Sequence, residues 1–452
     1  MSDSPHVLCV NPWIHDFAAF DFWLKPLGLL SLAAILRQAG IRVSFIDCLD
    51  RYHPRETEPV KTAWDGRGPF RKTPVALADI LPSSAGQLPR IRKPFSRYGI
   101  LPKWFLKDLS TLDRPDLIFV TSLMTYWASG VAETISMIRS VFPDVPVVLG
   151  GKYATLCQDH AIVFSGADHV VAGQGEPVLA ELVARFTGFP VRLDPRPEDP
   201  PFPALDLCSK LTYAPVLTAR GCPFSCEYCA SSFLEPRMIR RSVDRVFDEI
   251  CHWHHRYQVK NIAFYDDALL VNGPGHAYPL MEKIIESDLS LFFHTPNALH
   301  IREITAEAAD LMFRAGFKTI RLGLETAAFS KDRRHDVKVR ADEFFRAVTA
   351  LKTAGFESGQ IGAYLLCGLP DQDLDDVADS MAFVRNAGIL PVLAHYTPIP
   401  HTPMWETAVS GARFDLNRHP VFANNSLFPC VPSEQDRHRI SQLKNQRVSD
   451  IV

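Results

Sequence analysis

The chain has 452 residues, of which 47% are hydrophobic, enough to bury a large core divided over two or three domains. Its formal net charge of −3 gives no overall basic surface, which counts against nucleic acid as a partner. The N-terminus lacks a cationic segment followed by an apolar one, and the longest apolar stretch, residues 27–36, is too short to span a bilayer. We therefore expect a soluble cytoplasmic protein without a membrane partner.

The first part of the chain alternates predicted strands and helices. Apolar runs at 6–10 and 42–48 flank a segment with helical spacing at 25–40, and further strands are predicted at 116–122, 145–151 and 167–176. This alternation predicts a doubly wound, Rossmann-like parallel sheet over residues 1–186, with ligands beyond the carboxyl ends of its strands.

Residues 51–112 interrupt this pattern. They are rich in proline and charge, which predicts an irregular insertion. The insertion and the aromatic segment 13–26 are expected to shape the substrate site.

A second pattern follows residues 187–213, which are dense in proline and predict a linker. Six strand-helix units occupy 214–408, and 409–452 form a C-terminal extension. The six strands are expected at 215–219, 261–266, 291–296, 318–325, 360–368 and 390–398. Six units predict a partial (β/α)6 TIM-like barrel, with its chemistry at the carboxyl ends of the strands.

Three cysteines, Cys222, Cys226 and Cys229, lie in "CPFSCEYC" on the predicted loop after the first barrel strand. Clustered thiolates select zinc, copper(I) or iron–sulfur. A closed zinc site needs a fourth Cys or His, and no His lies between 222 and 251. Electron-transfer clusters usually show a fourth cysteine, which is also missing nearby. Three ligands would leave one iron of a cubane open, although a structural zinc site or unrelated core cysteines stay open as alternatives.

Other cysteines and histidines lack metal-ligand spacing. Cys251, His254 and His255 share a predicted helical face, which is more typical of a solvated helix end. Cys157 and His160 are expected on one turn of a packed helix, with a polar contact to a ligand as the alternative.

The C-x3-C-x2-C spacing on this loop resembles the signature of the radical S-adenosylmethionine (SAM) superfamily, over roughly residues 212–408. The resemblance implies a [4Fe–4S] cluster whose open iron chelates SAM. It also implies an external electron donor such as flavodoxin or ferredoxin. Reduction then cleaves SAM to a 5′-deoxyadenosyl radical, which abstracts hydrogen from the substrate.

The resemblance extends to residues around SAM. Tyr228 stands where the family places a residue near the adenine. Asp266 and Asp267, in "FYDD", stand where polar residues hold the SAM amino group; capping of the following helix is the alternative. "RLGLET" resembles the ribose-binding segment, with Glu325 as the candidate and Arg321 as a carboxylate partner; a buried salt bridge is the alternative for Glu325.

Two later segments also resemble the family. "GAYLLCGLP", from Gly362 past Leu366, resembles the strand whose backbone flanks the adenine. "YTPIPHTPMWE" resembles the sixth-strand ending, but His401 replaces the usual glycine, so we expect a change on the substrate side.

The front sheet together with the barrel resembles the radical SAM subclass that carries a cobalamin-binding domain. "TSLMTYW" and "VVLGGKY", with Gly150 and Gly151, stand where that family borders the cofactor. A simple turn explains the two glycines equally well. The D-x-H-x-x-G motif, which supplies a histidine to cobalt, does not occur. Cobalamin is therefore a candidate cofactor, and a front domain that binds only substrate or a partner is the alternative.

These patterns predict a radical SAM enzyme that acts on a small molecule. Cobalamin-dependent methyl transfer to an unactivated carbon is the leading hypothesis. The alternatives are cobalamin-independent rearrangement or dehydrogenation, RNA modification, and a non-catalytic iron–sulfur or metal-binding sensor.

Overall fold

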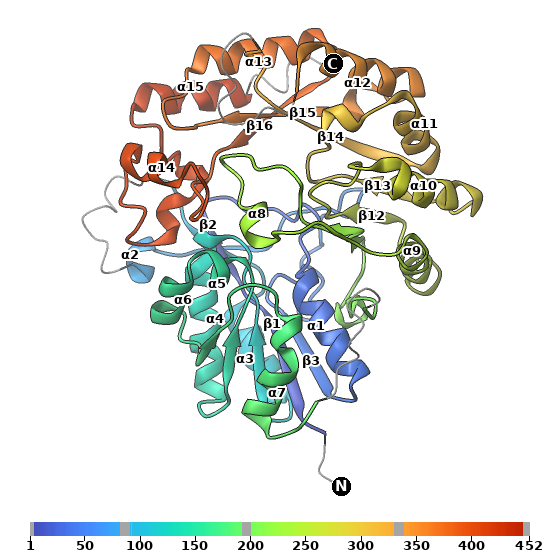
Figure 1. The fold of residues 1–452 in the computed structure, drawn as a ribbon. Helices are drawn as coiled ribbons and strands as arrows, with labels where there is room; N and C mark the ends of the chain where they lie inside the picture. The colour runs from blue at the N-terminus through green and yellow to red at the C-terminus, as the bar shows by residue number, and fades with distance from the viewer. Residues whose placement is uncertain (1–3, 82–90, 92, 192–199, 330–338, 446–452) are drawn as a thin grey trace. The chain divides into compact units, whose positions relative to one another are not determined.

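The computed structural model describes residues 4–81, 91, 93–191, 200–329 and 339–445. The chain divides into two compact units, one of residues 1–211 with 416–423 and one of 212–415 with 424–452. The predicted extension 409–452 thus contributes to both units. Figure 1 labels the elements in chain order.

The first unit is built on a five-stranded parallel sheet of order β3-β1-β6-β7-β8. Its strands are β1 (His6–Asn11), β3 (Arg42–Asp47), β6 (Leu117–Val120), β7 (Val147–Leu149) and β8 (His169–Val170). In register, Val7 pairs with both Val43 and Leu117. The central strands are buried on both faces, which is why they read as continuous apolar runs.

Helices cover both faces of this sheet. Val7 and Cys9 point to a core shared with α1 (Leu27–Gln38) and α7 (Leu179–Thr187). Leu8 and Val10 point to the opposite core. The helices on that side are α3 (Pro102–Thr111), α4 (Ala128–Val141), α5 (Lys152–Leu156) and α6 (Gln158–Phe164). The doubly wound prediction is confirmed.

The structure differs from the prediction within 51–112, which is not irregular throughout. A small antiparallel sheet of order β2-β5-β4 joins Ile14–Asp16, Ser96–Tyr98 and Lys72–Pro74. The short helix α2 spans Leu77–Ile80, and α3 buries Phe105 and Leu109 in the core. These strands have only three residues each, too few for a readable period.

The second unit contains a six-stranded parallel sheet of order β9-β12-β13-β14-β15-β16, in which each strand pairs with the next in the chain. The strands are β9 (Ala214–Val216), β12 (Asn261–Phe264), β13 (Phe292–His294), β14 (Phe317–Glu325), β15 (Ile361–Cys367) and β16 (Leu390–His395). The predicted six-unit partial barrel is confirmed.

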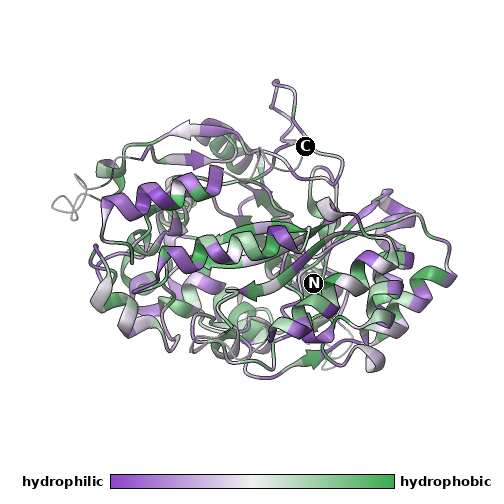
Figure 2. Ribbon diagram, turned by 90° about the horizontal axis from the view of Figure 1, so that it is seen from above, coloured by the Kyte–Doolittle hydropathy of each residue, from purple (hydrophilic) through white to green (hydrophobic). Residues whose placement is uncertain are grey.

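Helices connect these strands. They are α8 (Ser231–Leu234), α9 (Val243–Tyr257), α10 (Ala277–Glu286), α11 (Ala306–Ala315), α12 (Ala341–Ala354) and α13 (Leu374–Asn386), followed by α14 (Trp405–Gly411) and α15 (Glu434–Asn445). A two-stranded ribbon pairs β10 (Ala219–Arg220) with β11 (Ile239–Arg240). Figure 2 shows helices that carry both hydrophilic and hydrophobic residues, as in α9, which buries Val246, Ile250 and Trp253.

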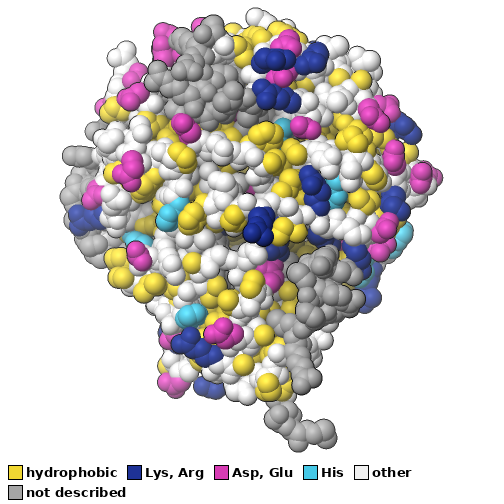
Figure 3. Space-filling view, in the orientation of Figure 1, with side chains coloured by type: hydrophobic (Ala, Val, Ile, Leu, Met, Phe, Trp, Pro, Cys, Tyr) yellow, Lys and Arg dark blue, Asp and Glu magenta, His cyan; other side chains and the backbone are white. Residues whose placement is uncertain are grey.

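Three further observations concern the length of the helices, the charges on the surface and the state of the cysteines. No helix among the described residues is long and apolar enough to cross a membrane. On the face seen in Figure 3, positive and negative side chains are interspersed rather than gathered by sign. All ten cysteines are free thiols.

Candidate active site

The cysteine loop leaves the carboxyl end of the first strand of the second unit. It begins at Gly221, whose φ of +83° favours glycine and whose Cβ would lie 2.6 Å from the carbonyl oxygen of Arg237. Within the loop, Cys229 N–H donates to Cys226 O at 3.0 Å and closes a turn. Cys226 is buried, and Cys222 and Cys229 are half-buried.

The three thiols of this loop do not converge on one point at metal-ligand distances among the residues that the structure describes. The described part of the chain holds no group of three or more His, Cys, Asp or Glu side chains placed to bind a metal ion. Polar contacts already reach one sulfur, because both the backbone N–H and Oγ of Ser231 lie against Cys229 Sγ, at 3.4 and 3.2 Å. The cysteines therefore stay a prediction that rests on their number, spacing and position.

Asp266 fastens the loop to the sheet. Its buried carboxylate accepts hydrogen bonds from Thr218 Oγ1 at 2.6 Å, Thr218 N at 3.0 Å and Ala219 N at 2.7 Å. His276 Nε2 contacts Thr218 Oγ1 from the other side at 3.1 Å. Asp266 thus holds the residues from which the cysteine loop departs, and its contact with SAM stays a prediction.

Burial of Asp266 predicts a pH dependence. Desolvation raises the pKa of Asp266 from 3.8 to about 6, although hydrogen bonds from Thr218 and Ala219 act in the opposite direction. Because the folded-state pKa exceeds the unfolded one, this carboxyl stabilises the fold below about pH 4, and that contribution is lost as the pH rises to about 6. The change is about 3 kcal/mol.

Replacing Asp266 with Asn should remove this dependence. In denaturant titrations, we expect the unfolding free energy of Asp266→Asn to gain about 3 kcal/mol relative to the unsubstituted chain between pH 4 and pH 7. Asp267→Asn, at the exposed neighbouring position, is the control. Parallel pH profiles for Asp266→Asn and the unsubstituted chain would show that Asp266 does not titrate as its burial predicts.

Asp267 is exposed and lies closer to the cysteines. It accepts a hydrogen bond from Ser231 Oγ at 3.0 Å, and this hydroxyl in turn contacts Cys229 Sγ. Asn297, which follows β13, donates to the carbonyl of Tyr265 at 2.8 Å and reaches Asp267 Oδ1 at 3.4 Å. Of the predicted carboxylate pair, Asp267 is therefore the one positioned to meet a ligand.

Glu325 ends β14 in a left-handed backbone conformation, with a φ of +65°. Such a conformation costs a non-glycine residue about 1–2 kcal/mol and is typical of functional sites. Arg321, in contrast, donates to the carbonyls of Ile320 and Gln360, which lie at the starting end of β15. The roles predicted for Glu325 at the ribose and for Arg321 at a carboxylate stay predictions.

Three further residues that were predicted to lie near SAM occupy different places in the second unit. They are Gly362, Leu366 and Tyr228. Gly362 lies second in β15, where a Cβ would meet Val392 and Arg321, so its smallness serves packing between strands. Leu366 lies next to the end of β15, and its carbonyl accepts from Gln372 Nε2 at 2.9 Å. Tyr228 is half-buried between the second and third cysteines.

His401 has a left-handed backbone conformation, which favours glycine. Its φ is +66°, and its exposed ring stacks on Phe233 with centroids 4.2 Å apart and planes 1° apart. Its segment is tied to the cysteine loop because Met404 N–H donates to Glu227 O at 3.1 Å. Where the radical SAM family has glycine, His401 thus adds an aromatic side chain beside α8, just past the cysteines.

Sequence reasoning missed several polar residues here. Thr218, Ser231 and Asn297 are ordinary loop residues whose partners only the fold reveals. His300 is the clearest omission, because its Nε2 lies 3.6 Å from Cys222 Sγ across 78 residues of sequence.

In the first unit, Gly150 and Gly151 follow β7 and face Ser122, which follows β6. A Cβ on Gly151, whose φ is +98°, would lie 2.2 Å from Ser122 O, whereas a Cβ on Gly150 would meet nothing within 4 Å. Ser122 Oγ donates to Gly150 O at 2.7 Å. Gly151 therefore allows close approach of two loops, and Gly150 faces open space at the carboxyl edge of the sheet.

Cys157 and His160 lie at the first turn of α6, because Cys157 is the N-cap of this helix and its carbonyl accepts a hydrogen bond from Ala161 N–H at 2.9 Å. Cys157 also packs against the core of the first unit. His160 Nδ1 contacts Tyr153 Oη at 2.7 Å, and burial lowers the pKa of His160 to about 4.

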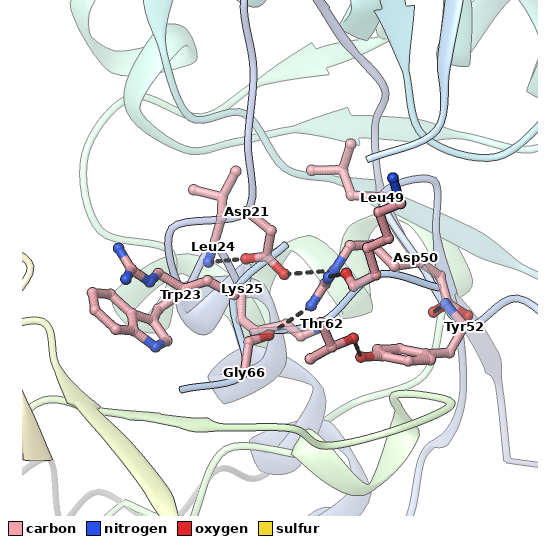
Figure 4. A network of polar contacts seen from close by, with 12 residues as sticks. Asp21, Trp23, Leu24, Lys25, Leu49, Asp50, Tyr52, Thr62 and Gly66 are labelled. Atoms are coloured by element: carbon pink, nitrogen blue, oxygen red, sulfur yellow. Dashed lines mark hydrogen bonds and ion pairs between the residues drawn. The ribbon is translucent and has the colours of Figure 1, made fainter. Parts of the chain in front are cut away.

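A buried polar network holds the loops that follow β1 and β3 (Figure 4). Asp21 accepts from Leu24 N at 2.8 Å and pairs with Arg51 Nε at 3.1 Å, and Arg51 donates to Gly66 O at 2.6 Å. Both members of the ion pair are buried. Trp23 is also buried here, whereas Phe20 and Phe22 are exposed, so only part of the aromatic segment faces outward.

Comparisons with known proteins match both units. Residues 216–384 match the model of the radical SAM superfamily, and residues 103–183 match the B12 binding domain. The chain carries a radical SAM domain preceded by a B12-binding domain. A radical SAM domain uses a [4Fe–4S] cluster and SAM, and a B12-binding domain takes cobalamin, so the predicted cofactors are confirmed at the level of the domains.

This radical SAM protein is also similar to individual proteins. It is 26% identical over 336 residues to an uncharacterized methyltransferase, PH0819, of Pyrococcus horikoshii, covering 66% of this chain and 70% of that protein. It is 22% identical over 339 residues to the anaerobic magnesium-protoporphyrin IX monomethyl ester cyclase of Rubrivivax gelatinosus, covering 67% of this chain and 60% of the cyclase.

Its fold resembles that of TsrM from Kitasatospora setae, a radical SAM methyltransferase solved with tryptophan substrate and a SAM analog. The TM-score is 0.64 at 16% identity, over 90% of this chain and 76% of TsrM. At this identity the likeness establishes the shared fold.

Proposed function

We propose that the protein is a cobalamin-dependent radical SAM methyltransferase that acts on an unactivated carbon of a small molecule. The observation that carries the proposal is the combination in one chain of a B12-binding domain with a radical SAM domain whose first strand leads into a three-cysteine loop. The methyltransferase relative PH0819 and the fold shared with TsrM support methyl transfer as the outcome.

The cysteine loop offers thiolate sulfurs, which are the ligands that a [4Fe–4S] cluster requires. Cys222, Cys226 and Cys229 would supply three soft thiolates and leave one iron open. A cluster there would supply the electron that cleaves bound SAM. The chain's own part is to hold the loop through Asp266 and to donate one hydrogen bond to Cys229 Sγ from the backbone N–H of Ser231.

Two carboxylates are placed to hold SAM. We assign Asp267 to the ammonium group, because it is exposed and linked through Ser231 to Cys229. We assign Glu325 to the ribose hydroxyls, because a carboxylate accepts their hydrogen bonds and its strained conformation points to a constraint other than stability. Tyr228 stays our candidate for the adenine side.

The front unit suits cobalamin at the carboxyl edge of its sheet. Gly150 leaves open space there, and so does Gly173, which follows β8. His15, in β2, is buried, and its Nε2 lies 2.7 Å from Glu133 Oε2. Bound cobalamin would supply a carrier for the methyl group, held by the backbone around Gly150.

The remaining partners follow from the chemistry. We expect a reductant such as flavodoxin or ferredoxin to deliver the electron, and a cytoplasmic setting in which thiols stay reduced. The formal net charge of −3 and the interspersed charges on the one face seen in Figure 3 support a small molecule over a polyanion as the substrate.

Cofactor loading tests the proposal. Protein reconstituted anaerobically with iron and sulfide should hold about four irons and four sulfides per chain. Equilibrium dialysis against hydroxocobalamin should give one bound cobalamin, whose visible spectrum differs from that of the free cofactor. Loading of the cluster without any cobalamin binding would instead favour the second candidate function, a cobalamin-independent rearrangement or dehydrogenation. The cyclase relative is named for a reaction other than methyl transfer.

A further inference from the structure

His300 is the histidine that the fold brings to the cysteine loop. Its Nε2 lies 3.6 Å from Cys222 Sγ, and its ring lies against Phe224, with centroids 4.3 Å apart. The preceding residue is fixed to β14, because Leu299 N–H donates to Arg321 O at 2.7 Å and Leu299 O accepts from Gly323 N–H at 3.0 Å. The position of His300 is therefore set by the sheet and not by the loop itself.

We propose that His300 Nε2–H donates a hydrogen bond to the Cys222 thiolate and thereby raises the reduction potential of the cluster. The inference rests on the proposed function, since it requires Cys222 to hold iron. A thiolate has no proton to give, so across this contact the imidazole must be the donor. A hydrogen bond to a ligating sulfur withdraws negative charge from the cluster and favours the reduced, more negative state.

Zinc ligation by both His300 and Cys222 would also bring these two side chains into contact. In a tetrahedral Cys3His zinc site, with Zn–S near 2.3 Å and Zn–N near 2.0–2.1 Å, neighbouring N and S atoms are about 3.5–3.6 Å apart. The contact between His300 and Cys222 is of that length. However, no third ligand converges on the pair among the residues that the structure describes. We therefore favour the hydrogen bond and treat zinc ligation as an outcome of the test.

The test uses the full-length chain with its reconstituted cluster and needs no substrate. His300→Leu removes the donor, whereas His300→Gln keeps an N–H group. His255→Leu, on the exposed end of α9, is the matched control. For each protein, iron and sulfide are counted, and the midpoint potential is measured by a dithionite titration followed by electron paramagnetic resonance.

We expect His300→Leu to load a full cluster and to lower the equilibrium constant for its reduction about tenfold, a shift of about 59 mV for one electron. His300→Gln should recover part of the shift, and the control should show none. Equal potentials in all loaded proteins would overturn the inference while leaving the proposed function intact. Sulfide-free zinc in the unsubstituted chain, lost in both His300 variants, would overturn both.

Discussion

Replacing Cys226 with Ala should abolish the cluster and SAM cleavage together. Cys226 is the buried member of the three, and its carbonyl accepts the Cys229 N–H that closes the loop's turn. With only two thiolates left, a cubane would have two open irons instead of one. We expect the brown absorbance of reconstituted protein and the release of 5′-deoxyadenosine both to fall to background.

Cys251→Ala is the matched control, because it removes a thiol of the same unit that lies in α9 outside the loop. It should leave both signals unchanged. Circular dichroism and unfolding midpoints show whether Cys226→Ala stays folded. A folded Cys226→Ala protein with a full cluster would refute the assignment of the metal ligands.

Replacing Gly151 with Ala should destabilise the first unit by about 2–5 kcal/mol. The added Cβ would lie 2.2 Å from Ser122 O, and the φ of +98° disfavours any side chain. We combine about 1–2 kcal/mol for the left-handed backbone with about 1–3 kcal/mol for overlap. Denaturant unfolding of the protein without cofactors measures the change.

Gly150→Ala separates packing from ligand contact, since a Cβ there meets nothing within 4 Å. We expect the unfolding free energy to stay within about 0.5 kcal/mol of the unsubstituted chain while the affinity for cobalamin falls. Unchanged cobalamin affinity in Gly150→Ala would remove Gly150 from the cofactor surface. Unchanged stability in Gly151→Ala would contradict the close approach to Ser122.

The sequence predicted the architecture well because central strands of both parallel sheets, such as β6 and β12, are buried on two faces. Such strands therefore read as apolar runs between helical segments. The three cysteines were also readable, because their spacing is local. Each of these two patterns can be recognised within a short stretch of sequence, without knowledge of contacts between distant residues.

The partners of individual side chains depend on such contacts. Asp266 and Asp267 were predicted to meet SAM without a choice between them, and only the fold shows that Asp266 accepts hydrogen bonds from Thr218 and Ala219, 48 and 47 positions earlier. His300 was missed for the same reason. Within 51–112, a helix that begins at Pro102 followed strands too short to identify, so a partly regular segment was predicted to be irregular.

We infer that this chain cleaves SAM by radical chemistry and depends on cobalamin for methyl transfer. The most direct measurement is mass spectrometry of SAM products from reconstituted, reduced protein, with and without added cobalamin. We predict 5′-deoxyadenosine in both samples and S-adenosylhomocysteine only with cobalamin. Deoxyadenosine alone, unaffected by cobalamin, would contradict methyl transfer, and the absence of both products would contradict radical SAM activity itself.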